Sequence, residues 1–221
     1  ALAVAATAAY GLALDDTALS RLARRGSASA SRSIFGGFAV CHAGRGVGTV
    51  ADLSSHAEPV SVTDFDPALV IALVDAGPKA VSSRAAMRHT VETSPLYPAW
   101  AMSGKGDLAD MRAALERGDL DAVGEIAERN ALGMHATMLA ARPAVRYLSP
   151  ATVAVLDAVL RLRREGTPAY ATMDAGPNVK VLCHPADAAR VGEAVLAAAP
   201  GCSVVTARRG PGARLRTGAG L

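Results

Sequence analysis

A strand–turn–strand pattern between residues 169 and 184 constrains the fold of this chain more than any other segment. Gly176 and Pro177 interrupt regular structure between two short apolar runs, so a tight turn is predicted there, with strands at 169–174 and 178–184. Asp174 would then end the first strand, on a rigid scaffold, where a carboxylate can serve as a catalytic group. The alternative interpretation is an Asx-type turn residue that caps its own loop.

A second informative segment is the run of small hydroxyl residues between Arg25 and Arg32. Small residues let backbone amides and hydroxyls surround an anion, and the Arg32 guanidinium can hold a carboxylate or phosphate through two parallel hydrogen bonds. A flexible Ser/Ala linker is the alternative. However, Ile34, Phe35 and Phe38 follow at once and can anchor the segment in a core. The segment is therefore predicted to bind an anion.

A third segment combines a buried strand with a capped helix. The apolar run 68–74 predicts the strand, and Ser82 and Ser83 can cap the helix that follows. Arg84 lies in the first turn of that helix, where the helix dipole disfavours a cation. A bound anionic ligand would offset this cost, because helix N-termini favour anions. N-capping beside a solvated arginine is the alternative.

Four motifs in this order make the chain similar to a known family. They are RRGSxSxxRSxFGGF at 24–38, VSSRxxMxxTVETSPxY at 81–97, MHATM at 134–138 and MDAGPNV at 173–179. Together they resemble the diphosphomevalonate decarboxylases of the GHMP kinase superfamily. The resemblance covers nearly the whole chain up to about residue 208.

The resemblance implies roles for individual residues. Asp174 corresponds to the catalytic acid residue, which deprotonates or orients the tertiary 3-hydroxyl of the substrate. Arg32 corresponds to the arginine that holds the substrate carboxylate. The remaining substrate-binding residues, which contact phosphates or order the site, are Ser27, Ser29, Ser83 and Arg84.

The implied reaction is the ATP- and Mg²⁺-dependent decarboxylation of mevalonate 5-diphosphate to isopentenyl diphosphate through 3-phosphorylation, in isoprenoid biosynthesis. The resemblance also implies a cytoplasmic homodimer. Three alternatives remain: a decarboxylase of mevalonate phosphate, a 3-kinase, and a non-catalytic truncated fragment. Asp-Ala-Gly-Pro-Asn stands where general GHMP kinases usually have a glycine-rich motif, which favours a decarboxylase.

The chain also departs from the family pattern. Ala28 stands where glycine is usual, and the sequence starts inside an alanine-rich helix that the family's phosphate loop precedes. The glycine-rich stretch 44–48 is interpreted as a hairpin turn, so no nucleotide-binding residue is assigned. We therefore expect residues 1–221 alone to hydrolyse no ATP, to form no isopentenyl diphosphate, and to self-associate through a bare sheet edge.

Composition excludes several other classes of protein. The net charge is only +3, and its arginine clusters lack interleaved aromatic residues, so no nucleic-acid partner is expected. The apolar runs are too short or too interrupted to span a membrane. Three widely spaced cysteines indicate reduced thiols. His135 is interpreted as a hydrogen-bonded core residue, and no metal site is predicted because the other histidines lack ligand spacing: His42, His56, His89 and His184.

These patterns predict an α+β protein with a two-domain GHMP-kinase-like fold. Residues 1–64 would be an incomplete N-terminal domain like ribosomal protein S5, 65–208 a ferredoxin-like C-terminal domain, and 209–221 a disordered tail. The remaining predicted strands are 34–42, 47–63, 68–75 and 203–207, within a mixed antiparallel sheet covered by helices on one face. The predicted helices are 1–12, 16–26, 83–95, 99–117, 119–140 with a break or kink near Gly133, 149–165, and 185–199.

Overall fold

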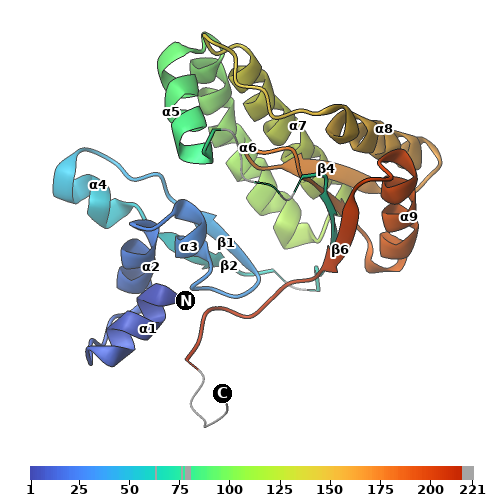
Figure 1. Cartoon of the computed structure of the whole chain (residues 1–221). Helices are drawn as coiled ribbons and strands as arrows, with labels where there is room; N and C mark the ends of the chain where they lie inside the picture. Colours follow the sequence, from blue (N-terminus) through green and yellow to red (C-terminus); the bar gives the residue numbers. More distant parts are fainter. Residues whose placement is uncertain (63, 76, 78–80, 216–221) are drawn as a thin grey trace. The chain divides into compact units, whose positions relative to one another are not determined.

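The computed structural model describes residues 1–62, 64–75, 77 and 81–215 (Figure 1). The chain divides into two compact units, each of which is described by itself. Unit 1 contains Ala1–Val62 and the described residues from Arg209 onward, and unit 2 contains the described residues between them, up to Arg208.

Unit 1 combines four short helices with a two-stranded antiparallel sheet. Its elements are α1 (Leu2–Ala9), α2 (Asp16–Arg24), α3 (Ala28–Arg32), β1 (Phe38–Cys41), α4 (Gly48–Ser54) and β2 (Ala57–Val60). The side chain of Asp15 accepts a hydrogen bond from the Ala18 amide at 2.7 Å, so it caps α2. The register of the sheet pairs Phe38 with Val60 and Cys41 with Ala57.

The predicted strand at 47–63 is wrong in its first half, where the structure has α4. The guanidinium groups of Arg21 and Arg24 bind the Asp52 carboxylate at 2.5 and 2.6 Å, which ties this helix to α2. These tertiary contacts outweigh the strand preference of the local sequence. The stretch 44–48 is accordingly not a hairpin turn, because residues 44–47 form a loop and Gly48 begins α4. Strand β2 is confined to Ala57–Val60.

The predicted disordered tail is wrong for its first residues. The Gly37 amide donates to the Gly210 carbonyl at 3.0 Å, and the Ala213 amide donates to the Ser33 carbonyl at 2.9 Å. The two backbones lie so close that a Cβ on Gly212 would come within 2.4 Å of the Ile34 carbonyl oxygen. Residues 209–213 therefore belong to unit 1, while 216–221 lie outside the described residues.

Unit 2 is built around a four-stranded sheet in the order β4-β5-β3-β6, in which every described pair is antiparallel. The antiparallel pairing agrees with the expected mixed antiparallel sheet, but the described strands form two sheets, one in each unit. The strands are β3 (Ala68–Leu73), β4 (Ala169–Met173), β5 (Val179–Cys183) and β6 (Ser203–Ala207). The helices are α5 (Ser83–Thr93), α6 (Tyr97–Arg117), α7 (Leu120–Leu139), α8 (Pro150–Arg164) and α9 (Ala188–Ala198), preceded by the short η1 (Pro185–Asp187).

Alternation along the strands creates the core of unit 2. Val70, Ala171 and Val181 belong to one buried cluster with Val155 of α8 and Val195 of α9, two helices that Figure 1 shows beside the sheet. Ser149 caps α8 as predicted, in a capping box with Thr152.

On the other side of β4, Tyr170 packs against Gly124 of α7, where an added Cβ would lie 2.2 Å from the ring. The sequence predicts a break or a kink near Gly133, and the break is wrong because α7 is continuous through this residue. Gly133 instead makes room for Trp100, whose Cδ1 would lie 2.8 Å from a Cβ at this position. The two glycines thus let α7 pack closely against Tyr170 of β4 and against Trp100 of α6.

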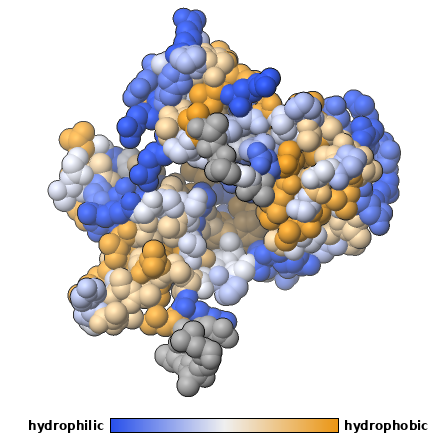
Figure 2. Space-filling view, in the orientation of Figure 1, coloured by the Kyte–Doolittle hydropathy of each residue, from blue (hydrophilic) through white to orange (hydrophobic). Residues whose placement is uncertain are grey.

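Large apolar side chains also reach the surface in both units, as the orange atoms in Figure 2 show. Examples are Leu2 of α1, Val47 before α4 and Met102 of α6. None of the helices in the described ranges combines the length and the apolar character that a membrane crossing requires.

Candidate active-site residues

Asp174 lies directly after β4, in the turn that leads to β5. Its side chain is 83% exposed, and its Oδ2 accepts a hydrogen bond from Lys180 Nζ at 2.5 Å. The Lys180 side chain is only 25% exposed. The carboxylate is therefore open to a ligand, while the cation beside it is held against the sheet.

Two hydroxyl groups from distant helices fix the backbone of this turn. Ser83 Oγ at the start of α5 donates to the Ala175 carbonyl at 3.0 Å. Thr152 Oγ1 of α8 donates to the Pro177 carbonyl at 2.8 Å. Hydrogen bonds to such partners limit how far the turn can move, and hold the Asp174 backbone in one place.

An amide and an imidazole complete this support. Asn178 Oδ1 accepts hydrogen bonds from the Val74 amide at 2.9 Å and from the Asp75 amide at 3.0 Å, which connects the turn to the end of β3. His135 Nε2 of α7 donates to the Asp174 carbonyl at 3.1 Å. The turn is thus bound to α5, α7, α8 and the end of β3.

His135 is a hydrogen-bonded core residue, as the sequence predicted, with 2% of its surface exposed. Burial lowers the pKa of its imidazole, and the hydrogen bond to the Asp174 carbonyl opposes this effect in part. A neutral His135 donates through Nε2 and so supports the backbone next to the reactive carboxylate.

The segment around Ser83 and Arg84 adopts the predicted helix start. Ser82 is the N-cap, since its side chain accepts from the Ala85 amide at 3.2 Å. Ser83 does not cap the helix but binds the Asp174 turn through its hydroxyl. Arg84 is exposed in the first turn of α5, and this turn contains no acidic residue. The structure therefore connects Ser83 with the Asp174 turn in unit 2, and Arg84 is the next residue of α5.

The small-residue segment forms α3 in unit 1, a helix that the sequence analysis missed. Ser27 caps it by accepting from the Ala30 amide at 3.0 Å. Arg32 Nη2 lies 3.4 Å from Ser29 Oγ, and both side chains are exposed. Ser29 and Arg32 line a hollow of about 450 Å³, together with the backbone of Gly37 and Gly210. The hydroxyl and guanidinium groups thus face open space that can accept an anion.

The sequence analysis did not single out Lys180 as a partner of Asp174. Val179 and Val181 alternate with it and face the core, so strand periodicity places Lys180 on the other face. The antiparallel register pairs it with Thr172, close to the end of β4. That position beside the turn is the signal that identifies it.

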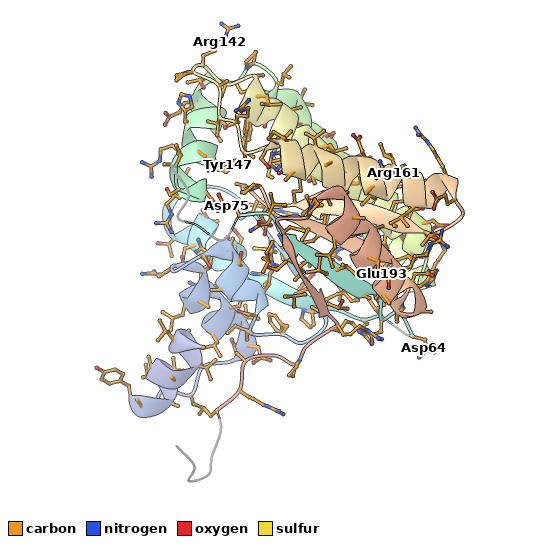
Figure 3. The ribbon with its side chains drawn as sticks, turned by 45° about the vertical axis from the view of Figure 1, so that its right-hand side comes forward. Asp64, Asp75, Arg142, Tyr147, Arg161 and Glu193 are labelled. Atoms are coloured by element: carbon orange, nitrogen blue, oxygen red, sulfur yellow. The ribbon has the colours of Figure 1, made fainter. Side chains whose placement is uncertain are left out.

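A larger hollow of about 1170 Å³ lies beside the turn, between α5 and residues 143–151. Its lining includes Pro177, Asp75 and Tyr147, and Figure 3 labels the last two. The Tyr147 hydroxyl donates to the Val81 carbonyl at 2.8 Å, and burial raises the pKa of this phenol. Neither Asp174 nor Arg84 lines this hollow, so it is separate from the open side of the carboxylate.

Solved structures define the class of protein. The chain superposes on a structure described as MDDEF in complex with MVAPP, AMPPCP and magnesium with a TM-score of 0.87 and 40% identity, covering 96% of this chain and 64% of the other. Mevalonate diphosphate decarboxylase from Staphylococcus aureus gives a TM-score of 0.81 and 36% identity, with 90% and 60% covered. The fold is that of the GHMP kinase superfamily, as the sequence motifs predicted.

Family models agree with this class. Residues 69–210 match the mevalonate 5-diphosphate decarboxylase C-terminal domain, and residues 1–56 match the diphosphomevalonate decarboxylase-like N-terminal domain. The chain belongs to the mevalonate 5-diphosphate decarboxylase family.

Curated relatives include two kinds of decarboxylase. Phosphomevalonate decarboxylase from Haloferax volcanii is 33% identical over 196 residues, which are 88% of this chain and 58% of that protein. Human diphosphomevalonate decarboxylase is 33% identical over 178 residues, which are 78% of this chain and 43% of that protein. The chain thus spans about half the length of the curated relatives that it matches.

Proposed function

We propose that the protein catalyses the ATP-dependent decarboxylation of mevalonate 5-diphosphate to isopentenyl diphosphate. The observation that carries this proposal is the Asp174 turn. Its carboxylate is open to solvent beside Lys180, while its backbone is bound to side chains of α5, α7 and α8. A fixed backbone with one accessible carboxylate suits a group that must orient a substrate hydroxyl.

Asp174 is assigned to the tertiary 3-hydroxyl of the substrate. Its carboxylate accepts the hydroxyl proton as the oxygen attacks the γ-phosphoryl group of ATP and ADP leaves. Lys180 holds the carboxylate in place. Phosphorylation converts a poor leaving group into a good one. The phosphate then departs from C3, and the electron pair of the breaking carbon–carboxylate bond forms the double bond as carbon dioxide leaves. The protein contributes mainly position and charge, as is usual in phosphoryl transfer.

Arg32 is assigned to the carboxylate that the substrate loses. Its guanidinium is exposed over the hollow in unit 1 and can bind a carboxylate through two parallel hydrogen bonds. Ser27, Ser29, Ser83 and Arg84 are assigned to the phosphates or to the order of the site. Arg84 suits a phosphate because an anion at the start of α5 would be favoured by both the cation and the helix dipole.

ATP and Mg²⁺ belong to this proposal because a similar structure holds AMPPCP and magnesium. The glycine-rich residues 44–47 lead into the short α4, and nothing in their geometry assigns them to a phosphate. No residue is therefore assigned to either group. We also propose that the protein is a cytoplasmic homodimer. In each subunit, residues 65–208 would form the C-terminal domain. Light scattering after size-exclusion chromatography tests the dimer.

Mevalonate 5-phosphate is the second candidate substrate. The relative from Haloferax volcanii named phosphomevalonate decarboxylase matches this chain with the same 33% identity as the human diphosphomevalonate decarboxylase. Both substrates carry the same carboxylate and 3-hydroxyl, so Asp174 and Arg32 would serve either one. The difference concerns only the number of phosphates to be held.

The test is an assay of the complete protein, rather than of residues 1–221 alone, with ATP, Mg²⁺ and each substrate, in which ADP, carbon dioxide, phosphate and isopentenyl phosphates are measured. Asp174→Asn should retain substrate binding and lose about 10²–10⁴-fold in turnover, the usual contribution of a general acid or base. Asp157→Asn, at an exposed position on α8, is the matched control and should retain full turnover. A loss below tenfold for Asp174→Asn would reduce Asp174 to a turn residue. Formation of ADP and a 3-phosphorylated product, with release of neither phosphate nor carbon dioxide, would indicate a 3-kinase.

A further inference from the structure

Two histidines and a glutamate meet on one face of the sheet in unit 1. His42 follows β1 and His56 precedes β2, and the His42 amide donates to the His56 carbonyl at 2.8 Å, so the two residues are cross-strand neighbours. Glu58 lies two residues beyond His56 and therefore on the same face. Ligand atoms of all three side chains lie within 4.8 Å of one another.

The side chains of this cluster contact one another, so their ligand atoms lie close together. His42 Nε2 lies 3.0 Å from Glu58 Oε1, and the two imidazole rings are 5.1 Å apart at their centroids. His56 Nδ1 is buried and has no hydrogen-bond partner among the described residues. Coordination to a cation through this nitrogen would supply the partner that it lacks, since buried polar groups in proteins are normally satisfied.

The backbone around the cluster is held from α2. Ser20 Oγ accepts from the Ala57 amide at 2.8 Å, and Arg24 Nε donates to the Ser55 carbonyl at 3.0 Å. Ser55 Oγ in turn donates to the His42 carbonyl at 3.0 Å. Residues on both sides of His56 are thus fixed, and the guanidinium of Arg24 is already paired with Asp52 at 2.6 Å. The ligands need little ordering before they bind.

We propose that His42, His56 and Glu58 bind one divalent transition-metal ion of the zinc class, with water completing its coordination. Two imidazoles and a carboxylate form a donor set that Zn²⁺ uses with an open fourth position. The side chains of His42 and Glu58 are 35% and 42% exposed, so water can reach such an ion. Mg²⁺ prefers oxygen ligands, so this cluster is distinct from the Mg²⁺ of the proposed reaction.

Local sequence patterns do not reveal this site, because His42 follows β1 whereas His56 precedes β2 and Glu58 lies in it. His42 and His56 are separated by 14 positions, a spacing that matches no local metal motif, and α4 lies between them. The antiparallel register places them opposite each other. The prediction that the chain has no metal site is therefore revised for this cluster.

The test is isothermal titration of the metal-free protein with zinc chloride alone, accompanied by thermal unfolding with and without zinc. We expect one zinc ion per chain and a higher Tm, because an ion that binds only the folded state stabilises it. Loss of a metal's outer-shell partner usually costs about 10–100-fold in affinity, so losing a ligand through His56→Ala or Glu58→Gln should cost at least as much. His184→Ala, at an exposed position in unit 2, should bind zinc like the parent.

Three outcomes would overturn the proposal. The first is that the parent binds no zinc. The second is that both Glu58→Gln and His56→Ala bind zinc as tightly as the parent does, and the third is that the rise in Tm with zinc survives in both variants. Glu58→Gln keeps the shape of the side chain, so it still decides the matter if His56→Ala unfolds. Cobalt(II) provides an independent readout, because nitrogen and oxygen ligands produce no thiolate charge-transfer band. Such a band, if it disappeared in Cys41→Ser, would assign the ion to cysteine instead.

Discussion

The Asp174 turn in unit 2 and the α3 segment in unit 1 carry the two groups of proposed site residues, yet they are held in different ways. The turn receives side-chain hydrogen bonds from α5, α7 and α8. Helix α3 is held by its own Ser27 cap and by backbone contacts of the neighbouring residues 33–37 with 210–213. A group that reacts needs a fixed position, whereas a group that only binds can be ordered by its ligand.

The largest expected effect comes from releasing the turn. Asn178→Ala removes the acceptor of the Val74 and Asp75 amides and should lower the free energy of unfolding by about 1–3 kcal/mol, the cost of leaving the part-buried Val74 amide without a partner. The Asp75 amide adds little, because its bond is exposed and water can replace the acceptor. Turnover should fall as well, because the Asp174 backbone loses its support. Urea unfolding measures the first effect, and Asn178→Asp, which keeps an oxygen acceptor, should retain most of the stability. Unchanged stability in Asn178→Ala would show that the turn is held locally.

The next effect concerns binding through α3. Arg32→Lys replaces a planar guanidinium with a point charge that cannot form two parallel hydrogen bonds, so binding of the mevalonate ligand should weaken by about 1–3 kcal/mol. ATP affinity and stability should change little, because the Arg32 side chain is exposed. Calorimetry with each ligand measures both affinities. Weakened ATP binding with an unchanged mevalonate ligand would contradict the assignment of α3 to the acid substrate.

A smaller effect should appear in the pH dependence of stability. Burial lowers the pKa of His135 below the ordinary 6.5, so the unfolded chain takes up the proton first as the pH falls. The stability contributed by neutral His135 is present above pH 6.5 and is lost below it, by about 1.4 kcal/mol per pH unit at most until the folded-state pKa is reached. Comparison of urea unfolding at several pH values in the parent and His135→Gln isolates this contribution. Equal slopes in the two proteins would rule it out.

The smallest effect is expected for Ser29→Ala. Its hydroxyl lies 3.4 Å from Arg32 Nη2 at an exposed position, so the free energy of unfolding should change by less than about 0.5 kcal/mol. Any effect should appear in the KM for the acid substrate. A clear loss of stability would mean that α3 is held as firmly by its side chains as the Asp174 turn is.

The sequence predicted the elements of unit 2 well because local signals and tertiary contacts agree there. Ser149 and Pro150 mark the start of α8, and Gly176 and Pro177 mark the turn, as observed. In unit 1 they disagree. Helix α4 is fixed by the ion pairs of Asp52 with α2, and the segment 209–213 is fixed by backbone contacts with residues 33–37. No local pattern reveals contacts of this kind.

The same reasoning applies to the candidate site. Asp174, Ser83 and Arg84 stand in motifs and could be assigned from them, and the structure connects Ser83 with the turn. The Lys180 contact depends on the register of β4 and β5, and the supporting bond from His135 depends on how α7 packs. Register and packing follow from the whole fold, so such partners become visible only in three dimensions.

The return of residues 210–213 to unit 1 affects how the chain matures during synthesis. The Gly37 amide finds its partner in the Gly210 carbonyl, and the Ser33 carbonyl finds its partner in the Ala213 amide, about 175 residues later in the chain. Unit 2 has its whole sheet by Ala207 and can fold as soon as that segment leaves the ribosome, whereas the first unit to be synthesised is the last to be closed. Until residues 210–213 are synthesised, the Gly37 amide and the Ser33 carbonyl lack these backbone partners.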